Sequence, residues 1–416
     1  MGSDKLFLGI FFLRIKIISI AYLQQDQDVR TVKSYFSCRN GKDEKYWHKI
    51  CENINRVQTR GWKMNIKNTD ITQFECFELS RNETLDFIRF LQKKAEVIAP
   101  HKKGEASFAY QTTERAEDVV LNYPRTIQPL KKFFLPPRET LLKFDRREQY
   151  YEKEHVEVKE RIFFAIHSYE MQGVKRLDYS FRRGNPESQY LTRREKSLFI
   201  GVSFTPDEYH FSKSVGIEIE QTDGFCLYFE PSEQGYWVFV ITEDGRRLMD
   251  EFGRGKPVKN KVEIDEKQFS NKIKLHFNRL PQVFEHVYKS PVWDKVAEKC
   301  VGCGTCNLLC PTCYCFDVRD EIELDVVHGE RRRFWDGCML NEFAEVAGGE
   351  NFRDKLSNRT RHRLHRKFKY ITEHSGELHC VGCGRCSKYC PADISIVSII
   401  NDLIDDYATQ QKKQLI

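Results

Sequence analysis

Two copies of one cysteine motif dominate the chemistry that this sequence could carry. In each copy, three cysteines stand two residues apart and a fourth lies directly before a proline. This spacing is typical of chains that wrap three thiolates around one corner of a cuboidal cluster, while the fourth thiolate reaches a second cluster. The copies are KCVGCGTCNLLCP, residues 299–311, and HCVGCGRCSKYCP, residues 379–391.

The spacing also predicts which cysteines share a cluster. Glycines inside both motifs allow tight turns and leave backbone N–H groups free to bond cluster sulfides. Structural zinc also uses paired cysteines, but a zinc site calls for neither a third cysteine nor one before proline, so the repeat favours iron. One [4Fe–4S] cluster is expected on Cys300, Cys303, Cys306 and Cys390, and the other on Cys380, Cys383, Cys386 and Cys310.

The remaining cysteines carry weaker signals. Most of the 15 cysteines lie between Cys300 and Cys390, which argues against a secreted disulfide scaffold and for redox centres in a reducing, cytoplasmic compartment. Three further cysteines near the first motif are interpreted as packed residues that shield a cluster, with extra ligands or a redox-active pair as alternatives; they are Cys313, Cys315 and Cys338. Four isolated ones are expected as buried small hydrophobes: Cys38, Cys51, Cys76 and Cys226.

A basic segment separates the two motifs. Residues 353–369 read RDKLSNRTRHRLHRKFK, with eight Lys or Arg and one acid. Nucleic-acid binding is disfavoured, because the segment lacks interleaved aromatics and the net charge of +6 on 128 charged side chains is mild. A solvated helix face, together with a role in balancing anionic clusters or docking an acidic partner, is favoured. His362 and His365 are expected at the surface.

The elements that must position these motifs follow from hydrophobic patterning. A capping box, Ser80 with Glu83, predicts a helix over residues 81–95. A second helix is expected over 171–181, and loops at Pro136-Pro137 and over 145–159. Short apolar runs predict buried strands over 162–166, 198–204, 225–229 and 236–242.

These elements predict an α+β chain, with a mixed α/β domain over 64–285. A mostly helical, ferredoxin-like dicluster domain follows over 291–402, with a helical insertion over 316–378 and a tail over 403–416. Residues 1–63 are an extension without a motif. Its apolar run, 6–23, contains Arg14 and Lys16, and a membrane span needs about 20 mostly apolar residues, so no transmembrane segment is expected.

Catalytic fingerprints are missing from the sequence. There is no GxGxxG after a strand, no P-loop and no nucleophile elbow. The chain is therefore expected to have no catalytic site of its own.

The motifs resemble a known family. CxxCGxCxxxCPTCxCFDV, RRRFWDGC, AGGENFR and CVGCGRCxxxCPxxI are similar to the β subunit of cytoplasmic [NiFe] sulfhydrogenases and to the electron-transfer subunit of anaerobic sulfite reductase. The resemblance implies two [4Fe–4S] clusters that relay electrons between a flavin subunit using NAD(P)H and the catalytic subunits of a hydrogenase-like complex. Sulfite reduction with a sirohaem subunit is the alternative. A structural zinc or nucleic-acid-binding protein is the alternative from another class.

The N-terminal domain resembles the family with one departure. The family's RPCD-type, strand-end and CFCxSxG motifs contain cysteines that this chain replaces with Tyr169, Phe204, Tyr209 or His210, and Phe211. If those cysteines hold an additional cluster in relatives, this chain cannot build it, and large aromatics are expected to fill the space. In that case this chain binds two clusters at most, as well as two at least.

Overall fold

A computed structural model describes residues 70–258 and 262–414, which belong to one structural unit of the chain. The extension predicted over 1–63, with its apolar run, Cys38 and Cys51, lies outside the described residues. Within the described ranges, every helix is too short or too polar to cross a bilayer.

A mixed sheet fills the first part of the described chain. Its eight strands, counted over the described residues, are ordered β10-β1-β9-β8-β7-β6-β2-β3, and β2, β6, β7 and β8 pair in parallel. The apolar runs predicted as strands form β6 to β9, buried because helices cover both faces. The bounds are β1 (Cys76–Ser80), β2 (Glu96–Lys102), β3 (Phe108–Thr112), β6 (Arg161–Ile166), β7 (Ser197–Val202), β8 (Leu227–Pro231), β9 (Gly235–Val240) and β10 (Lys256–Pro257).

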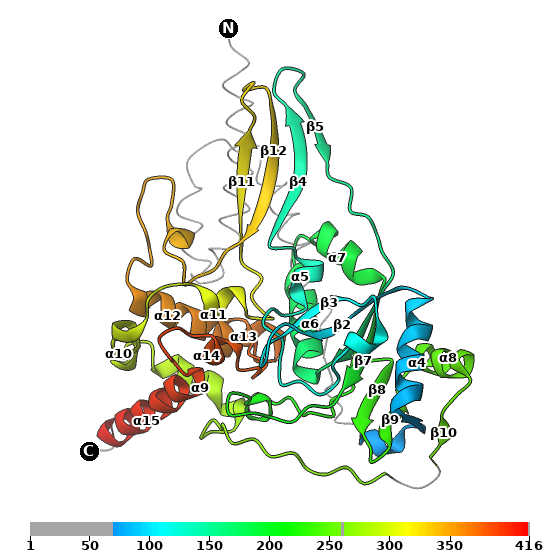
Figure 1. The fold of residues 1–416 in the computed structure, drawn as a ribbon. Coiled ribbons are helices and arrows are strands. Elements are labelled where there is room, and N and C mark those ends of the chain that lie inside the picture. Colours follow the sequence, from blue (N-terminus) through cyan, green and yellow to red (C-terminus); the bar gives the residue numbers. More distant parts are fainter. Residues whose placement is uncertain (1–69, 259–261, 415–416) are drawn as a thin grey trace, which may run out of the picture. The chain divides into compact units, whose positions relative to one another are not determined.

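Helices lie on both faces of this sheet (Figure 1). The predicted capping box is confirmed at the start of α4, where the Ser80 N–H donates to Glu83 at 2.8 Å and the Glu83 N–H donates to the Ser80 hydroxyl at 3.3 Å. α4 and α8 cover one face, and α5, α6 and α7 cover the other. The bounds are α4 (Arg81–Gln92), α5 (Lys131–Phe134), α6 (Ser168–Arg182), α7 (Ser188–Glu195) and α8 (Glu243–Phe252).

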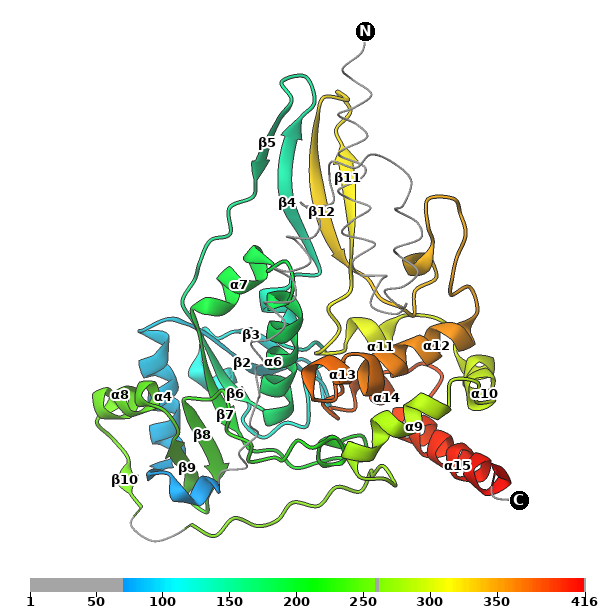
Figure 2. The ribbon, with the colours of Figure 1, turned by 180° about the vertical axis from the view of Figure 1, so that it is seen from behind.

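A second sheet projects beyond the first as an antiparallel arm (Figures 1 and 2). Its order is β11-β12-β4-β5 over the described residues. Two expectations are corrected here: the loop predicted over 145–159 contains β5, and the insertion predicted as helical begins with the hairpin β11–β12. β5 and β11 are largely exposed and rich in charged residues, so they lack the apolar runs by which hydrophobic patterning finds buried strands. The bounds are β4 (Arg138–Asp145), β5 (Tyr150–Lys153), β11 (Phe316–Ile322) and β12 (His328–Trp335).

The cysteine-rich part is built of short helices around a second hydrophobic core. This core also includes Tyr169, Phe204 and Phe211 of the first part, so both parts pack against each other. The helices are α9 (Leu280–His286), α10 (Val292–Lys299), α11 (Thr305–Leu308), α12 (Leu356–His365), α13 (Thr372–Ser375), α14 (Arg385–Lys388) and α15 (Ile396–Gln414). Single turns are η2 (Ile71–Gln73), η3 (Ala116–Asp118), η4 (Ser212–Val215), η5 (Phe277–Arg279), η6 (Glu342–Ala344) and the π turn η7 (Arg366–Tyr370).

Candidate metal centre

The first cysteine motif forms a loop between α10 and α11. Cys300 follows directly on α10, and Gly302 and Gly304 have positive φ angles of 68° and 74°. Other residues are strained in this left-handed backbone, so glycine allows the loop to turn tightly around the thiols. The Gly302 N–H donates to the Cys300 sulfur at 3.4 Å, so this amide points toward a thiol.

The second motif repeats the same loop. Gly382 and Gly384 have φ angles of 65° and 73°, and α14 follows them as α11 follows the first pair of glycines. α11 and α14 contact each other (Figures 1 and 2). The internal repeat of the sequence is therefore also a repeat in space.

Two adjoining cavities lie between these loops. Including their open mouths, the first measures about 580 Å³ and the second about 310 Å³. Cys386 and Arg363 line both cavities, which makes the cavities neighbours. The other cysteines of the first cavity are Cys300, Cys303, Cys306 and Cys390. Those of the second are Cys310, Cys380 and Cys383.

The two cysteines that precede proline have crossed over. Cys390 of the second motif lines the first cavity, and Cys310 of the first motif lines the second cavity. This placement supports the two ligand sets that the spacing predicts. Cys386 borders both cavities, and its spacing from Cys383 assigns it to the second set.

The donor set fits iron–sulfur clusters. Among the described residues, neither cavity is lined by a histidine or a carboxylate, and the metal-binding groups are the thiols together with the Met339 thioether in the first cavity. Burial raises the pKa of Cys306 and Cys380 to about 12 and that of Cys383 to about 11. These thiols are therefore protonated at neutral pH in the absence of metal, and metal binding must displace their protons.

The three further cysteines lie behind the ligand set. Asn307 Nδ2 is 3.3 Å from the sulfur of Cys313 and 3.5 Å from that of Cys338. A hydrogen bond from Cys313 holds the pKa of Cys310 well below its usual range. Cys315 is also near this group, and none of the three lines either cavity. The placement supports their interpretation as packed cysteines.

The two motifs differ in how far they reach the surface. Val301 is 66% exposed, whereas Val381, at the same place in the second motif, is 2% exposed. Cys303 is exposed and Cys383 is buried. The difference arises because the loop before η4 covers the second motif, where the Phe211 N–H donates to the Gly382 carbonyl at 2.9 Å.

The residues that replace the cysteines of the resembled family form an aromatic group. The rings of Tyr169 and Phe204 are 5.1 Å apart, and His210 lies 5.4 Å from Tyr169 and 5.0 Å from Phe204. All three side chains are buried. The ring of Tyr209 instead lies under Lys388. The three rings thus pack together at this place, and whether they fill the space of a cluster held by relatives stays a prediction.

A buried ion pair beside this group has no counterpart in the sequence predictions. Arg385, inside the second motif, pairs with Glu170 of α6, and both side chains are fully buried. Arg385 Nε also donates to the Thr126 carbonyl at 2.8 Å. The one sequence signal was the repeat itself, in which Arg385 stands where the first motif has Thr305.

The basic segment forms α12 and η7, and much of it is buried. Arg359, Arg363 and Lys367 recur at helical spacing and are 8%, 5% and 5% exposed. The solvated-face interpretation is therefore wrong for this side of the helix. His365, expected at the surface, is 1% exposed because it packs among the rings of α9 and α10.

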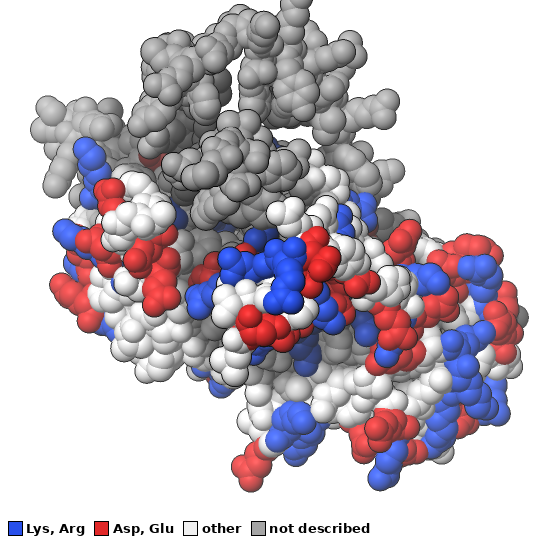
Figure 3. All heavy atoms as spheres, turned by 90° about the horizontal axis from the view of Figure 1, so that it is seen from above, with Lys and Arg blue, Asp and Glu red and all other residues white. Residues whose placement is uncertain are grey.

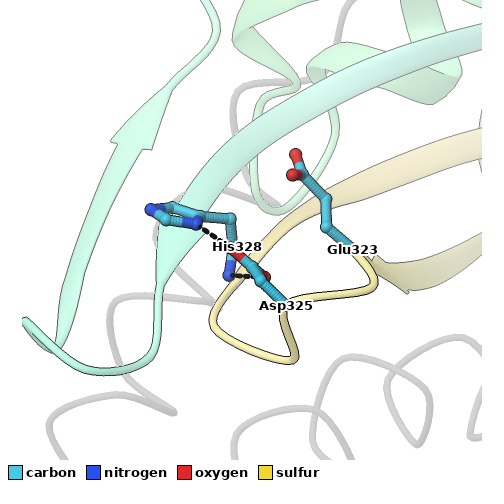
Figure 4. Close-up of side chains that lie close together, drawn as sticks. All are labelled: Glu323, Asp325 and His328. Atoms are coloured by element: carbon cyan, nitrogen blue, oxygen red, sulfur yellow. Dashed lines mark hydrogen bonds and ion pairs between the residues drawn. The ribbon is translucent and has the colours of Figure 1, made fainter.

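Charge elsewhere is mixed. On the face seen in Figure 3, basic and acidic side chains are interspersed rather than gathered by sign. At the β11–β12 turn, Glu323, Asp325 and His328 lie close together and are exposed (Figure 4). Asp325 accepts from the N–H groups of Val327 at 2.9 Å and His328 at 3.0 Å, so its visible role is to close the turn.

Comparison with known proteins identifies a family. The family described as a 4Fe-4S dicluster domain matches residues 299–394. The sulfhydrogenase 2 subunit beta of Pyrococcus furiosus is 32% identical over 328 residues, which cover 76% of this chain and 95% of that protein. The F420-dependent formate dehydrogenase subunit beta of Methanocaldococcus jannaschii is 23% identical over 184 residues, 41% of this chain and 39% of that protein. No solved structure matches.

The similarity to the Pyrococcus protein covers nearly its whole length, and the dicluster match falls on the two motifs whose thiols line the adjoining cavities. The chain therefore belongs to the family of sulfhydrogenase β subunits and is an electron-transfer protein with two [4Fe–4S] clusters.

Proposed function

We propose that this chain is the component of a cytoplasmic, hydrogenase-like complex that relays electrons between a flavin-containing NAD(P)H subunit and a catalytic subunit. When bound, the clusters supply one-electron carriers. Cys300, Cys303, Cys306 and Cys390 hold one cluster, and Cys380, Cys383, Cys386 and Cys310 hold the other.

One observation carries this proposal: the two thiol-lined cavities adjoin. Cys386 and Arg363 form part of the wall of both, so no separate layer of protein divides them. Apolar side chains such as Ile396, which lines both cavities, form part of the wall around the thiols. An arrangement of this kind suits transfer between two centres and provides no bound substrate position.

The residues of the first motif provide the contact with a redox partner. Val301 and Cys303 are exposed, and the corresponding residues of the second motif are covered by the loop before η4. A partner that exchanges electrons with this chain reaches the first cavity at the shorter distance. The sulfhydrogenase relative makes a hydrogenase context the first choice, and a gene for a [NiFe] or a sirohaem subunit beside this one decides between hydrogenase and sulfite reductase.

Anaerobic reconstitution of the full chain tests the proposal. We expect brown protein with about eight irons per chain, as two four-iron clusters require, and an EPR signal after reduction. Cys303→Ser is expected to lose or convert one cluster and retain the other. Cys226→Ala, which removes a buried thiol far from both motifs in sequence, serves as the control and is expected to retain both.

The outcomes separate the alternatives. Colourless protein with stoichiometric zinc would support the structural zinc function and reject the relay. About twelve irons per chain would show a third cluster and refute the upper count of two. Survival of both clusters and of electron transfer in Cys303→Ser would contradict the ligand sets.

A further inference from the structure

Two buried cations from the basic segment lie against the thiols. Arg363 lines both cavities and donates to the Cys306 carbonyl at 3.2 Å. Lys367 lines the second cavity, with its Nζ 3.1 Å from the sulfur of Cys310 and 2.8 Å from the hydroxyl of Thr312. Both side chains are 5% exposed. They come from successive turns, α12 and η7, of one continuous helical segment.

These cations have no carboxylate partner among the described residues. Arg363 Nε is buried without a hydrogen-bond acceptor, and ion pairs elsewhere in the described chain involve neither Arg363 nor Lys367. Arg385, which also lines the second cavity, differs because Glu170 neutralises its charge. The cysteine sulfurs that line the cavities, which become thiolates when a cluster binds, are therefore the main negative groups available to Arg363 and Lys367.

An unpaired buried cation is costly because burial removes its hydration. The cost is offset if a net negative charge lies in the cavity beside it. A cluster with four thiolate ligands carries such a charge, and reduction makes it more negative by one electron. A cation fixed beside the cluster consequently stabilises the reduced state more than the oxidised state.

We propose that Arg363 and Lys367 are the fixed counter-charges of the two clusters and set their redox potentials. Arg363 raises the potential of both clusters, since it borders both cavities. Lys367 acts mainly on the cluster bound through Cys310. This inference rests on the proposed ligand sets, and it makes the basic segment an internal electrostatic element rather than a docking surface.

Redox titration of the reconstituted full chain, followed by EPR under anaerobic conditions, tests the assignment. Arg363→Gln is expected to lower both midpoint potentials, and Arg363→Lys to restore most of the shift because it keeps the charge. Lys367→Met is expected to lower the potential of the second cluster more than that of the first. The Cys303→Ser protein identifies which signal belongs to the first cavity.

Arg361→Gln provides the matched control. Arg361 lies on the same helix, but its guanidinium stacks on the ring of Tyr288 at 4.0 Å and lines neither cavity. We expect its removal to leave both potentials unchanged. A shift as large as that of Arg363→Gln would overturn the proposal, because it would reflect overall charge alone.

Unchanged potentials in Arg363→Gln, with two clusters retained, would also overturn it. If Arg363→Gln loses iron, Lys367→Met decides: a larger shift of the second cluster supports the proposal, and equal or absent shifts refute it. Failure of the proposed relay is distinguishable, because the unmodified chain would then lack the iron content and EPR signals from which every comparison starts.

Discussion

The cysteine before each proline decides which cluster a substitution affects. Cys390 belongs to the second motif but lines the first cavity, and Cys310 belongs to the first motif but lines the second cavity. With the proposed ligand sets, each cluster joins two motifs that lie far apart in the sequence. Loss of one such thiol disconnects the two repeats as well as removing a ligand.

Paired serine variants are predicted to reveal this crossing. Cys390→Ser should alter the same EPR signal as Cys303→Ser, and Cys310→Ser the same signal as Cys383→Ser. The reason is that each pair of thiols lines one cavity. Grouping by position along the chain, with Cys390→Ser matching Cys383→Ser, would contradict the crossed ligand sets.

The glycines of the two motifs should differ in their tolerance of alanine. A Cβ on Gly382 would lie 2.4 Å from the backbone of Ser212, whereas one on Gly302 would lie 3.1 Å from a methyl group of Leu356. Strain of the left-handed backbone predicts a cost of about 1 to 2 kcal/mol for Gly302→Ala. Gly382→Ala should cost more, because the covering loop must move.

Thermal unfolding of the cluster-loaded proteins measures this difference. Gly302 and Gly382 have nearly equal φ angles of 68° and 65°, so the strain of the left-handed backbone is nearly the same in both alanine variants. A difference in stability between the variants therefore comes from the neighbouring residues. Equal losses of stability would show that the covering loop yields without cost.

At the scale of elements, sequence patterning found what is local. The capping box of α4 and the apolar strands β6 to β9 were predicted because cap geometry and hydrophobic runs are short-range signals. The arm formed by β4, β5, β11 and β12 was missed, since β5 and β11 are exposed and charged and the pairing of β12 with β4 joins segments far apart in the sequence. Arg333 pairs with Glu139 across that gap, with both side chains at 9% exposure or less.

The residues of the candidate site were also predicted only where the sequence signal is local. The eight ligand candidates could be named from spacing alone, because cluster geometry fixes the spacing. The buried face of α12 could not be predicted, because a run of basic residues is expected to face solvent unless a cavity beside it is known. His365 was misplaced for the same reason: rings from α9 and α10 bury it, and those contacts are long-range.

Packing of α12 against α9 and α10 predicts acid sensitivity. Burial lowers the pKa of His365 to about 4, with Arg361 and Lys369 adding to the effect, and its Nδ1 lies 2.9 Å from the Arg361 carbonyl. Below pH 6.5, His365 is protonated in the unfolded chain but stays neutral in the folded chain until about pH 4. The contribution of His365 to the free energy of unfolding is therefore constant above pH 6.5 and decreases as the pH falls from 6.5 to 4. The loss at about pH 5.5 is about 1 kcal/mol.

His365→Gln is expected to reduce this dependence by about 1 kcal/mol at about pH 5.5, since glutamine does not titrate, and the remaining slope is expected from other histidines whose pKa burial also lowers, such as His362 and His210. Unfolding temperatures of the cluster-loaded protein between about pH 7.5 and 5.5 measure the slope. His328→Gln is the control, because His328 is exposed and Asp325 raises its pKa. The same slope in His365→Gln and in the unmodified chain would show that His365 is not the group responsible.

For the described part of the molecule as a whole, the two repeats are chemically alike but differently placed. The N-terminal sheet domain supplies the loop that covers the second motif and the Glu170 that neutralises Arg385. The first motif receives no such cover from the described residues of that domain. A near-symmetric pair of binding loops thus becomes a relay with an exposed end and a buried end.

This asymmetry can be measured without knowing the partner. A soluble dysprosium chelate speeds the electron-spin relaxation of centres near the surface, and the effect falls steeply with distance. We predict that it acts strongly on the cluster altered by Cys303→Ser and weakly on the other, because Cys303 is exposed and Cys383 is buried under residues 209–212.

Gly382→Ala, which must displace that cover, should increase the effect on the second cluster, whereas Gly302→Ala should not. Equal relaxation of both clusters in the unmodified chain would mean that the N-terminal domain does not shield the second motif, and the assignment of the first motif as the point of electron exchange would then lose its basis.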